Sequence, residues 1–538
     1  MTIGEKIIQL RTREHISQEQ LAEKMSVSRQ SISKWEMDQA LPQIDKVLQL
    51  CEFFNITTDE LLHDKFSIKA SNERVKNKYF GTDGFRGEAN MDLTSIHAYK
   101  VGRFLGWYYS SALSGCDRNN YRPKIVIGKD TRRSSYMLEY SIVAGITASG
   151  ADAYMLHVTT TPSVSYVTRQ DEFDCGIMIT ASHNPFYDNG IKGINKYGEK
   201  LDDETTALIE AYIDGDLGVL GVAGDDLPFA RRDRIGCIID YVAGRNRYLG
   251  YLISIASHSY KNLRIGLDCA NGASWMLAKG LFGALGAKTY VIGDEPDGLN
   301  VNSDCGSTHI ESLIKLVKEK HLDIGFAFDG DCDRCLAVDE NGVVVDGDGI
   351  MYILAKRLKE RGMLNDDTVV ATIMSNSGLI KSLDKIGIKC RQTTVGDRFV
   401  YECMQENDYS LGGEQSGHII LKKYATTGDG LLTAIMVAEE VLDQKSTLSK
   451  LCAPVTLYPQ YTVNVRVKDK DAVFADKAVT DELAEIENLI GGCGRVLLRK
   501  SGTEPVIRIM TECENMDLCV SYADRVAKKI IDGGHGCE

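Results

Sequence analysis

The pattern of apolar residues at the start of the chain is helical. Within residues 3–10, apolar side chains recur at a spacing that gathers them on one face of a helix. Ser17 and Gln20 have the spacing of a capping box, which predicts a second helix start, and Ser28 precedes another apolar period. We therefore expect residues 1–64 to form an all-α domain.

From Tyr79 onward the pattern changes to short strands that alternate with helices. Residues 65–77 separate the two patterns; they have no apolar period and are expected to form a linker. Short apolar runs at 124–130, 264–272 and 323–331 each end in a polar loop, and a helical pattern follows each of them. This alternation predicts α/β units with mainly parallel sheets, whose functional loops lie at the carboxyl ends of strands.

The end of the chain carries three apolar runs of strand length and two helical stretches, which predicts a smaller α+β domain. A length of 538 residues allows several domains of ordinary size.

Composition narrows the functional classes. Hydrophobic residues make up 43% of the chain and charged residues 26%, which is usual for folded domains and argues against disorder. The formal net charge of -14 does not favour attraction to nucleic acid or to an anionic membrane through the overall field. An anionic substrate would therefore need a local cationic site.

Cysteine use and the N-terminal sequence favour a cytoplasmic protein. The 15 cysteines are scattered and odd in number, and the charged N-terminus lacks the apolar core of a signal peptide. No apolar run reaches the roughly 18 residues that a membrane span needs. We expect reduced thiols and a cytoplasmic location.

The first loop with candidate chemistry is Thr180–Pro185, which follows an apolar strand pattern. Ser182 at a strand end is a candidate nucleophile that carries a phosphoryl group and so divides one difficult transfer into two. An isolated motif this short is more often a polar turn that ends at a proline.

The second loop holds Asp329, Asp331 and Asp333 at alternate positions, followed by Arg334. Carboxylates with this spacing can converge on one hard cation, and Mg²⁺ prefers oxygen ligands and suits phosphoryl transfer. A solvated acidic turn is the alternative. A calcium-binding EF-hand loop is a further alternative, but Gly330 is not followed by a glutamate at the spacing expected beyond the glycine of such a loop.

The third loop, residues 412–418, combines glycines with polar side chains. Glu414, Ser416 and His418 are suited to hydrogen bonds with sugar hydroxyls, and the glycines permit backbone shapes closed to other residues. Taken alone, the loop is equally typical of a glycine-rich turn with a satisfied histidine.

The fourth loop is 499–505, with Arg508 just beyond. Backbone N–H groups, the hydroxyls of Ser501 and Thr503, and two guanidiniums can enclose a phosphate. A basic hairpin turn is the alternative. Together, the four loops supply a nucleophile, a metal site, hydroxyl recognition and a phosphate clamp, which describes phosphoryl transfer on a phosphosugar.

The chain from about Lys78 to its C-terminus resembles the α-D-phosphohexomutase superfamily. The resemblance covers about 460 residues and all four loops in the family order. These segments carry it: YFGTDGFRG (79–87), SHNPFYDNGIK (182–192), VDGDGIMY (345–352), VGDRFV (395–400), TTGDG (426–430) and RKSGTEPVIRIM (499–510). It implies three α/β domains at 78–240, 241–346 and 347–455 and a smaller α+β C-terminal domain at 456–538, preceded here by the all-α domain.

The resemblance also implies roles for individual residues. Ser182 would be the phosphoserine and would bind one Mg²⁺ per chain together with Asp329, Asp331 and Asp333. Arg86 and Lys192 would lie near the transferring phosphoryl, with Lys192 and His418 in acid–base or orienting roles. The remaining substrate contacts would come from these residues: Arg334, Glu414, Ser416 and His418 for the sugar, and Arg499, Ser501, Gly502, Thr503 and Arg508 for the distal phosphate.

Within the superfamily, the resemblance is nearest to bacterial enzymes that interconvert glucosamine 6-phosphate and glucosamine 1-phosphate through a bisphosphorylated sugar. Glucose or mannose phosphate as substrate is one alternative. A transcriptional regulator that senses a hexose phosphate is another. Cys332 departs from the family, which usually has glycine at this position of the metal loop.

Residues 17–36 resemble a helix-turn-helix of the Cro/C1 repressor type, which implies double-stranded DNA as a partner. The candidate DNA-binding residues are Gln18, Ser28, Arg29, Gln30, Ser31 and Lys34. Residues 1–70 hold nine Lys/Arg against eleven Asp/Glu, so this part is not broadly basic. A module for protein interaction or dimerisation is the alternative, and an oligomer would suit palindromic DNA sites.

Overall fold

The computed structural model divides into two compact units, Met1–Lys76 and Asn77–Glu538. The residues that it describes are 3–13, 16–25, 27–37, 40–54, 58, 61, 78–111, 121–492, 494–500 and 505–536. The predicted linker 65–77 lies outside them. Among the described residues, none of the helices has both the length and the apolar character that crossing a bilayer would require.

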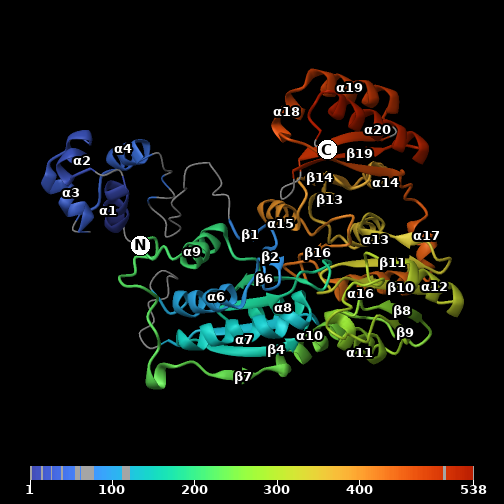
Figure 1. Cartoon of the computed structure of the whole chain (residues 1–538), viewed down its shortest axis with the longest axis horizontal. Helices are drawn as coiled ribbons and strands as arrows, with labels where there is room; N and C mark the ends of the chain where they lie inside the picture. The colour runs from blue at the N-terminus through green and yellow to red at the C-terminus, as the bar shows by residue number, and fades with distance from the viewer. Residues whose placement is uncertain are drawn as a thin grey trace. The chain divides into compact units, whose positions relative to one another are not determined.

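The N-terminal unit is helical where it is described (Figure 1). Its helices are α1 (Ile3–Arg13), α2 (Gln18–Lys24), α3 (Arg29–Glu36) and α4 (Ile44–Phe54). The capping box before α2 is formed: Gln20 N–H donates to Ser17 Oγ (3.2 Å), and Ser17 N–H donates to Gln20 Oε1 (2.7 Å). The helices enclose a core that includes Ile7, Leu21 and Trp35.

The first helix differs in detail from the predicted apolar stripe. Ile7 and Leu10 are buried as expected, but Ile8 is 39% exposed, whereas Lys6 is 1% exposed. The Lys6 ammonium donates to the carbonyl of Leu61 (3.3 Å), so its aliphatic stem fills the space and its charge finds a backbone partner.

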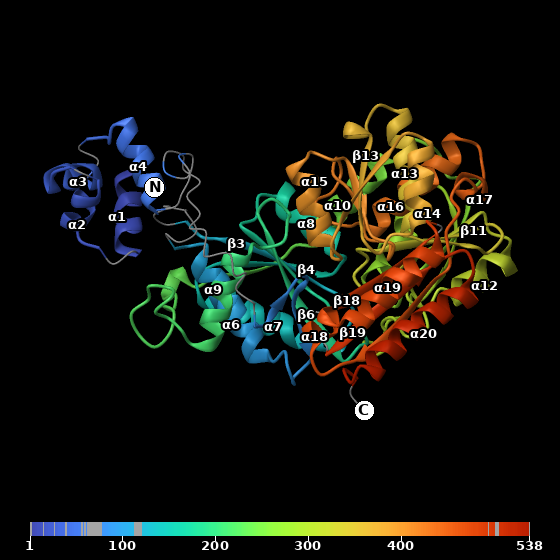
Figure 2. The same cartoon turned by 90° about the horizontal axis from the view of Figure 1, so that it is seen from above.

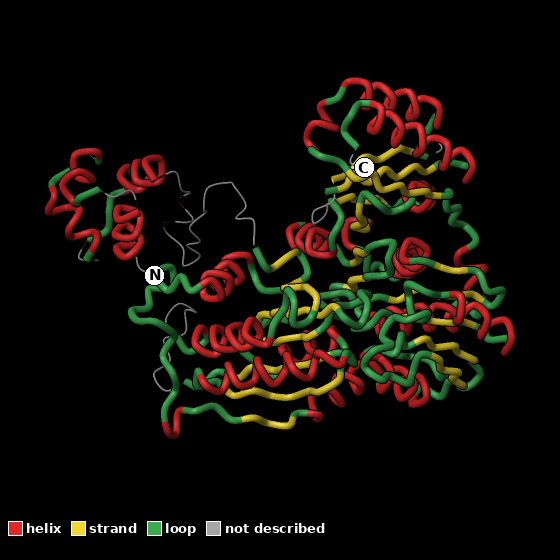
Figure 3. Tube along the Cα trace, in the orientation of Figure 1, coloured by secondary structure: helices red, strands yellow, loops and turns green. Residues whose placement is uncertain are grey.

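The second unit is built on four sheets, which Figure 3 shows in yellow. The first has the order β1-β2-β6-β5-β3-β4-β7. Its strands are β1 (Phe80–Gly81), β2 (Gly84–Glu88), β3 (Lys124–Lys129), β4 (Asp152–Val158), β5 (Cys175–Ile179), β6 (Asp188–Asn195) and β7 (Ile238–Asp240). The helices of this part are α6 (Ser95–Tyr108), α7 (Arg133–Ala148), α8 (Thr161–Gln170) and α9 (Asp203–Asp214).

Alternate residues of β3 bury both faces of this sheet. Ile125 and Ile127 belong to the core under α6 and α7, whereas Val126 belongs to the core that holds Val164 of α8. The pairings of β3 with β4 and β5 are parallel, but β6 folds back antiparallel on β5. That return brings Lys192 beside Met178, directly before the Ser182 loop.

The second sheet corrects one expectation. Its order is β12-β11-β10-β8-β9, with β8 (Arg264–Asp268), β9 (Lys288–Ile292), β10 (Ile324–Phe328), β11 (Cys335–Asp339) and β12 (Val344–Val345). The run 323–331 was expected to lead into a helix, but the chain turns at the acidic loop and returns as antiparallel β11. The helices here are α10 (Val242–Ile255), α11 (Ala278–Ala284) and α12 (Glu311–Lys320).

The third sheet, β14-β13-β15-β16, carries the predicted sugar loop on a hairpin. Its strands are β13 (Thr368–Thr372), β14 (Lys389–Thr393), β15 (Leu411–Gly413) and β16 (Ile419–Leu421). The surrounding helices are α13 (Gly347–Glu360), α14 (Ser377–Lys385), α15 (Asp397–Glu406), α16 (Gly430–Asp443) and α17 (Leu448–Cys452). One continuous core joins this part to the second sheet.

The C-terminal part is the smaller α+β fold that the pattern predicted. Strands β17 (Gln460–Arg466), β18 (Arg495–Lys500) and β19 (Val506–Glu512) form an antiparallel sheet with β19 in the centre. Helices α19 (Lys477–Ile490) and α20 (Met516–Asp532) lie side by side over it, and α18 (Lys470–Ala475) precedes them (Figure 2).

Candidate active site

Ser182 lies just after β5, in a turn that leaves its backbone in the left-handed region. Its φ is 51°, a conformation that costs a residue with a side chain about 1–2 kcal/mol. The backbone N–H of Ser182 donates to Thr180 Oγ1 (2.9 Å), and Ser182 Oγ donates to Asp329 Oδ2 (2.5 Å). The hydroxyl is therefore directed at the acidic loop after β10.

A buried arginine organises this turn. Arg132 is fully buried, and its Nε donates to Asp130 Oδ2 (2.8 Å). Its Nη2 donates to the carbonyls of Ser182 (2.9 Å) and Asn184 (2.8 Å), and its Nη1 donates to two more carbonyls further along the loop. One guanidinium thus holds four backbone carbonyls and stabilises the strained conformation of Ser182.

Asp329, Asp331 and Asp333 converge after β10. They are 0%, 0% and 4% exposed, and each offers a carboxylate oxygen within 4.8 Å of the others. Burial, together with the charges of Asp333 and Asp331, raises the pKa of Asp329 well above its usual value. Carboxylates that are this close and this buried repel one another unless a cation lies among them.

The cluster fits a hard divalent cation. Asp331 Oδ1 and Asp333 Oδ1 are buried and accept no hydrogen bond from any described residue, so both keep lone pairs for a ligand. Ser182 Oγ lies against the third carboxylate, that of Asp329. Three converging carboxylates form the oxygen-rich donor set that Mg²⁺ prefers, and this arrangement can hold a metal ion.

Lys192 on β6 is buried against the cluster. Its Nζ lies 2.9 Å from Asp331 Oδ2, 3.2 Å from Asp333 Oδ2 and 3.1 Å from Asp83 Oδ2. Burial alone would lower the pKa of this ammonium, but the carboxylates of Asp331, Asp83 and Asp333 raise it well above its usual value. Arg86 on β2 also forms an ion pair with Asp83, so the two cations share one carboxylate beside the cluster.

The nucleophile turn and the acidic loop approach each other at Gly330. A Cβ on Gly330 would lie 2.5 Å from the carbonyl oxygen of Ser182 and 3.1 Å from Nδ2 of Asn302. Because both neighbours are held by hydrogen bonds, neither can move away at low cost. Glycine is therefore required for the spacing between Ser182 and the carboxylates.

We expect Gly330→Ala to separate the two loops. It should lower kcat for phosphoryl transfer at Ser182 by about tenfold or more, because misplacement of reacting groups by about 1 Å is costly. Steady-state kinetics at saturating Mg²⁺ measure this. Gly280→Ala is the matched control, since a Cβ there meets nothing within 4 Å. Equal activity of the two variants would contradict the spacing argument.

His418 lies at the end of the β15–β16 hairpin loop and faces the acidic loop. It is 3% exposed, its Nε2 accepts from the N–H of Gly428 (3.0 Å), and its Nδ1 is 3.7 Å from Asp333 Oδ1. With Nε2 used as an acceptor, the neutral ring carries its proton on Nδ1. The predicted sugar loop is thus joined to the predicted metal loop through this side chain.

Glu414, Ser416 and Arg334 lie in the same two loops, and two of them keep polar atoms available for a ligand. Glu414 Oε1 accepts from the N–H of Gly396 (3.1 Å). Ser416 Oγ and Arg334 Nε are buried and have no hydrogen-bond partner in the described part of the chain. Buried polar atoms of this kind call for a partner such as a substrate hydroxyl or a phosphate.

Arg499 on β18 and Arg508 on β19 are direct cross-strand partners. Burial and the neighbouring Arg508 guanidinium lower the pKa of Arg499, and the carboxylate of Glu414 opposes this. Two adjacent guanidiniums favour an anion between them. The other residues predicted for the phosphate site, Ser501, Gly502 and Thr503, lie outside the described residues.

Cys332 occupies the acidic loop without entering its ligand set. Its φ is 61°, in the region that favours glycine, and its side chain is fully buried in a core cluster with Phe328 and Cys335. Burial raises the pKa of the Cys332 and Cys335 thiols well above their usual values, so both are unreactive packing residues.

Several residues of the site escaped the sequence reasoning. Arg132 looked like an ordinary basic residue, and Asp83 was quoted only as a letter of a motif. Lys200 bridges Asp83 (2.8 Å) and Asp397 (2.7 Å), and neither Lys200 nor Asp397 was expected in the site. The only available signal was the motif VGDRFV, which contains Asp397 but gives no role for it.

Comparison with protein families covers most of the second unit. Residues 77–217, 246–342 and 346–458 match the alpha/beta/alpha domains I, II and III of phosphoglucomutase/phosphomannomutase, and residues 463–529 match its C-terminal domain. The chain belongs to the phosphoglucomutase/phosphomannomutase family. It is therefore an isomerase of the phosphohexomutase type, with the expected four-domain architecture. Residues 7–61 match a helix-turn-helix family.

Individual relatives are similar over nearly their whole length. Phosphoglucosamine mutase of Lachnospira eligens is 58% identical over 458 residues, which cover 85% of this chain and 99% of that protein. Phosphoglucosamine mutase of Bacillus subtilis is 47% identical over 453 residues, which cover 84% of this chain and 98% of that protein. The matched lengths are close to that of the second unit, Asn77–Glu538.

Solved structures confirm the fold. A phosphoglucomutase/phosphomannomutase family protein from Burkholderia thailandensis has a TM-score of 0.70 at 23% identity, over 86% of this chain and 98% of its own. The Aspergillus fumigatus N-acetylphosphoglucosamine mutase, in complex with GlcNAc-6P and magnesium, has a TM-score of 0.60 at 19% identity, over 85% and 96%.

Proposed function

We propose that the chain is a cytoplasmic phosphoglucosamine mutase, which interconverts glucosamine 6-phosphate and glucosamine 1-phosphate with one Mg²⁺ per chain. The observation that carries the proposal is the 2.5 Å hydrogen bond from Ser182 Oγ to Asp329 within a buried group of three aspartates. The names of relatives at 58% and 47% identity support glucosamine over glucose or mannose.

The reaction begins with a phosphoryl group on Ser182. The free hydroxyl oxygen of the sugar phosphate forms a bond to phosphorus as the bond from phosphorus to Ser182 Oγ breaks, which gives a bisphosphorylated sugar. The sugar turns, and Ser182 Oγ forms a bond to the phosphorus of its other phosphoryl as the bond from that phosphorus to the sugar oxygen breaks, which frees a sugar hydroxyl. Held by Asp329, Asp331 and Asp333, Mg²⁺ would neutralise negative charge on the phosphoryl oxygens.

The other residues of the site bind and orient the sugar phosphate. Arg86 and Lys192 supply positive charge at the transferring phosphoryl, since both lie beside the carboxylate cluster. Lys192 and His418 are the candidates for acid–base or orienting roles at the sugar hydroxyl. The sugar contacts are assigned to Arg334, Glu414, Ser416 and His418, and the distal phosphate to Arg499, Ser501, Gly502, Thr503 and Arg508.

Relative turnover of three sugar phosphates tests the substrate. With Mg²⁺ and a catalytic amount of a sugar bisphosphate, we expect kcat/KM for glucosamine 1-phosphate to exceed that for glucose 1-phosphate and mannose 1-phosphate by about tenfold or more. A preference for glucose or mannose would overturn the glucosamine assignment but keep the reaction. No turnover of any of them would favour a sugar-phosphate sensor.

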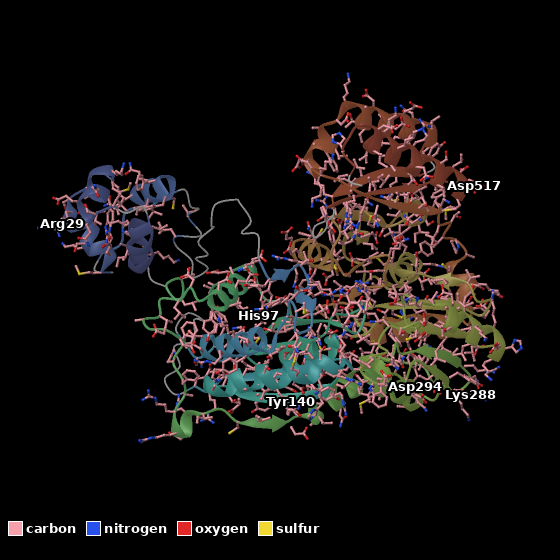
Figure 4. All side chains as sticks on the ribbon, viewed as in Figure 1. Arg29, His97, Tyr140, Lys288, Asp294 and Asp517 are labelled. Carbon is pink, nitrogen blue, oxygen red and sulfur yellow. The ribbon has the colours of Figure 1, made fainter. Side chains whose placement is uncertain are left out.

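DNA binding by the N-terminal unit is a second candidate function. Arg29, Gln30 and Lys34 are exposed on α3, and Figure 4 shows Arg29 at the surface of this unit. Ser28 Oγ accepts from Ser31 N–H (3.2 Å) as the cap of α3, whereas Gln18 Nε2 donates to Glu36 Oε2 (2.6 Å). Double-stranded DNA would meet the first three side chains directly.

Selection from a pool of random double-stranded DNA tests this function. We expect the full-length protein to enrich one sequence, and the combined change Arg29→Ala, Gln30→Ala, Lys34→Ala to weaken its binding by about tenfold or more. Gln49→Ala, an exposed position on α4, is the control. Failure to enrich any sequence would indicate a protein-interaction module instead.

A further inference from the structure

Five charged side chains and the imidazole of His418 close a ring behind the reacting centre. Asp333 Oδ2 lies 3.2 Å from Lys192 Nζ, which lies 3.1 Å from Asp83 Oδ2. Asp83 Oδ1 lies 2.8 Å from Lys200 Nζ, which lies 2.7 Å from Asp397 Oδ2. Three carboxylates and two ammonium groups alternate along this path.

His418 completes the ring. Its Nε2 is 3.5 Å from Asp397 Oδ2, and its Nδ1 is 3.7 Å from Asp333 Oδ1, the residue at which the path began. The ring members come from separate segments: the β1–β2 turn, β6 and the turn after it, the acidic loop, the start of α15, and the end of the sugar loop. No sequence pattern joins them.

We propose that Lys200 and Asp397 are positioning residues for the mutase reaction, which hold Lys192 and His418 in their working places by closing this ring. The proposal rests on the proposed function above. Neither residue touches the acidic loop directly; Lys200 acts through Asp83, and Asp397 acts through His418.

The position of the Lys192 ammonium depends on the charge of Lys200. Asp83 faces three cations, Lys192, Arg86 and Lys200, and divides its two oxygens among them. Without the Lys200 charge, Asp83 has only Lys192 and Arg86 to attract. Lys192 would then move toward Asp83 and away from the carboxylates of the acidic loop, because a partly buried carboxylate attracts its nearest cation most strongly.

The position of the His418 imidazole depends on Asp397. The imidazole lies between Asp397 and Asp333, and the N–H of Gly428 fixes its tautomer. Lys200 holds Asp397 by both oxygens (2.7 and 2.9 Å). Asp397 Oδ2 faces the acceptor Nε2 at 3.5 Å, so Lys200 is needed to compensate its charge there. A change of either Lys200 or Asp397 therefore alters the field at Nε2 and shifts the imidazole that is aimed at the acidic loop.

The same region contains contacts that only dock α15 against the start of α9 and the turn after β6. Arg398 pairs with Asp203 (2.5 Å), and Tyr401 donates to Glu199 (2.8 Å). A cavity of about 470 Å³ lies beside these contacts and is lined by Lys200 and Asp397 among others. Lys200→Met therefore has room for its side chain and removes only the charge, whereas Asp203→Asn weakens the docking and leaves the ring intact.

A double-mutant cycle on the full-length enzyme tests the ring. Lys200→Met and Asp397→Asn are each expected to lower kcat for glucosamine 1-phosphate by about tenfold, with KM changed by less than about threefold. The double variant should be no slower than the slower single one, since either change opens the ring. Lys200→Arg, which keeps the charge, should restore most of kcat.

Two matched variants separate the ring from its surroundings. Lys196→Met changes an exposed lysine of the same turn, and Asp203→Asn removes the partner of Arg398; both should keep kcat within about twofold of wild type. A kcat loss for Asp203→Asn as large as for Asp397→Asn would overturn the proposal, and so would multiplicative losses in the double variant.

A measurement without catalysis keeps this proposal distinct from the proposed function. Hydrogen exchange of the full-length protein should speed up in both 189–195 and 416–421 for Lys200→Met, because the ring joins these segments. If the wild type turns over no sugar phosphate, the proposed function fails, and the ring is judged on this exchange. Unchanged exchange in both segments would overturn the ring itself.

Discussion

Ser182→Ala is expected to lower mutase turnover by roughly three orders of magnitude or more, because it removes the oxygen that carries the phosphoryl group. The Oγ that is lost is the atom 2.5 Å from Asp329. Alanine fits the same turn, since the backbone at φ 51° is held by Arg132 and Asn302 through the Ser182 carbonyl. The thermal midpoint should therefore stay close to that of wild type.

Intact-mass measurement separates loss of the nucleophile from loss of the site. After incubation with a sugar bisphosphate, the wild type should gain one phosphoryl group and Ser182→Ala should gain none. Ser254→Ala changes an exposed serine on α10 and should behave as wild type. Phosphorylation of the Ala variant, or turnover near the wild-type rate, would assign the covalent role to another residue.

Much of the fold could be predicted from local pattern alone. The runs at 124–130 and 264–272 became β3 and β8, which are buried except at their first residues, as parallel strands between helices are. The three runs near the C-terminus became β17, β18 and β19. The pattern could not reveal the partner of a strand. The run 323–331 has the same form as the others, yet it continues into antiparallel β11 rather than a helix.

The candidate site also contains some residues that local spacing could reveal and others that it could not. Three aspartates within five positions are close in space in any folded loop, so their spacing alone predicts a metal site, and the described residues bring them together. Lys192, and the acid–base or orienting role of His418, could be assigned only through the resemblance to a family. Their nearness to Asp333 depends on how β6 and the sugar loop pack around the acidic loop.

Residues that act through other residues left no local signal. Lys200 and Asp397 are 197 positions apart in the chain and meet only after folding. Arg132 is adjacent to Arg133 and looks identical to it in sequence, but Arg132 is fully buried whereas Arg133 is exposed. Local composition cannot distinguish such neighbours, because the difference arises from the loop that folds over one of them.

Arg132→Met is the second change with a large expected effect. The variant leaves buried carbonyls of the nucleophile turn without a donor and removes the charge partner of Asp130, which is itself fully buried. Loss of one member of a buried charged pair costs about 3–5 kcal/mol of unfolding free energy. The turn that presents Ser182 would relax from its left-handed backbone, so phosphorylation and turnover should fall together.

Denaturant unfolding and intact-mass phosphorylation measure the two parts of this effect. Arg133→Met is the matched control and should change neither. Arg132→Lys keeps a charge beside Asp130 but cannot reach four carbonyls at once, because an ammonium has three donors on one atom. It should therefore regain more stability than activity. Wild-type phosphorylation in Arg132→Lys would mean that charge alone, rather than the fork of the guanidinium, holds Ser182 in place.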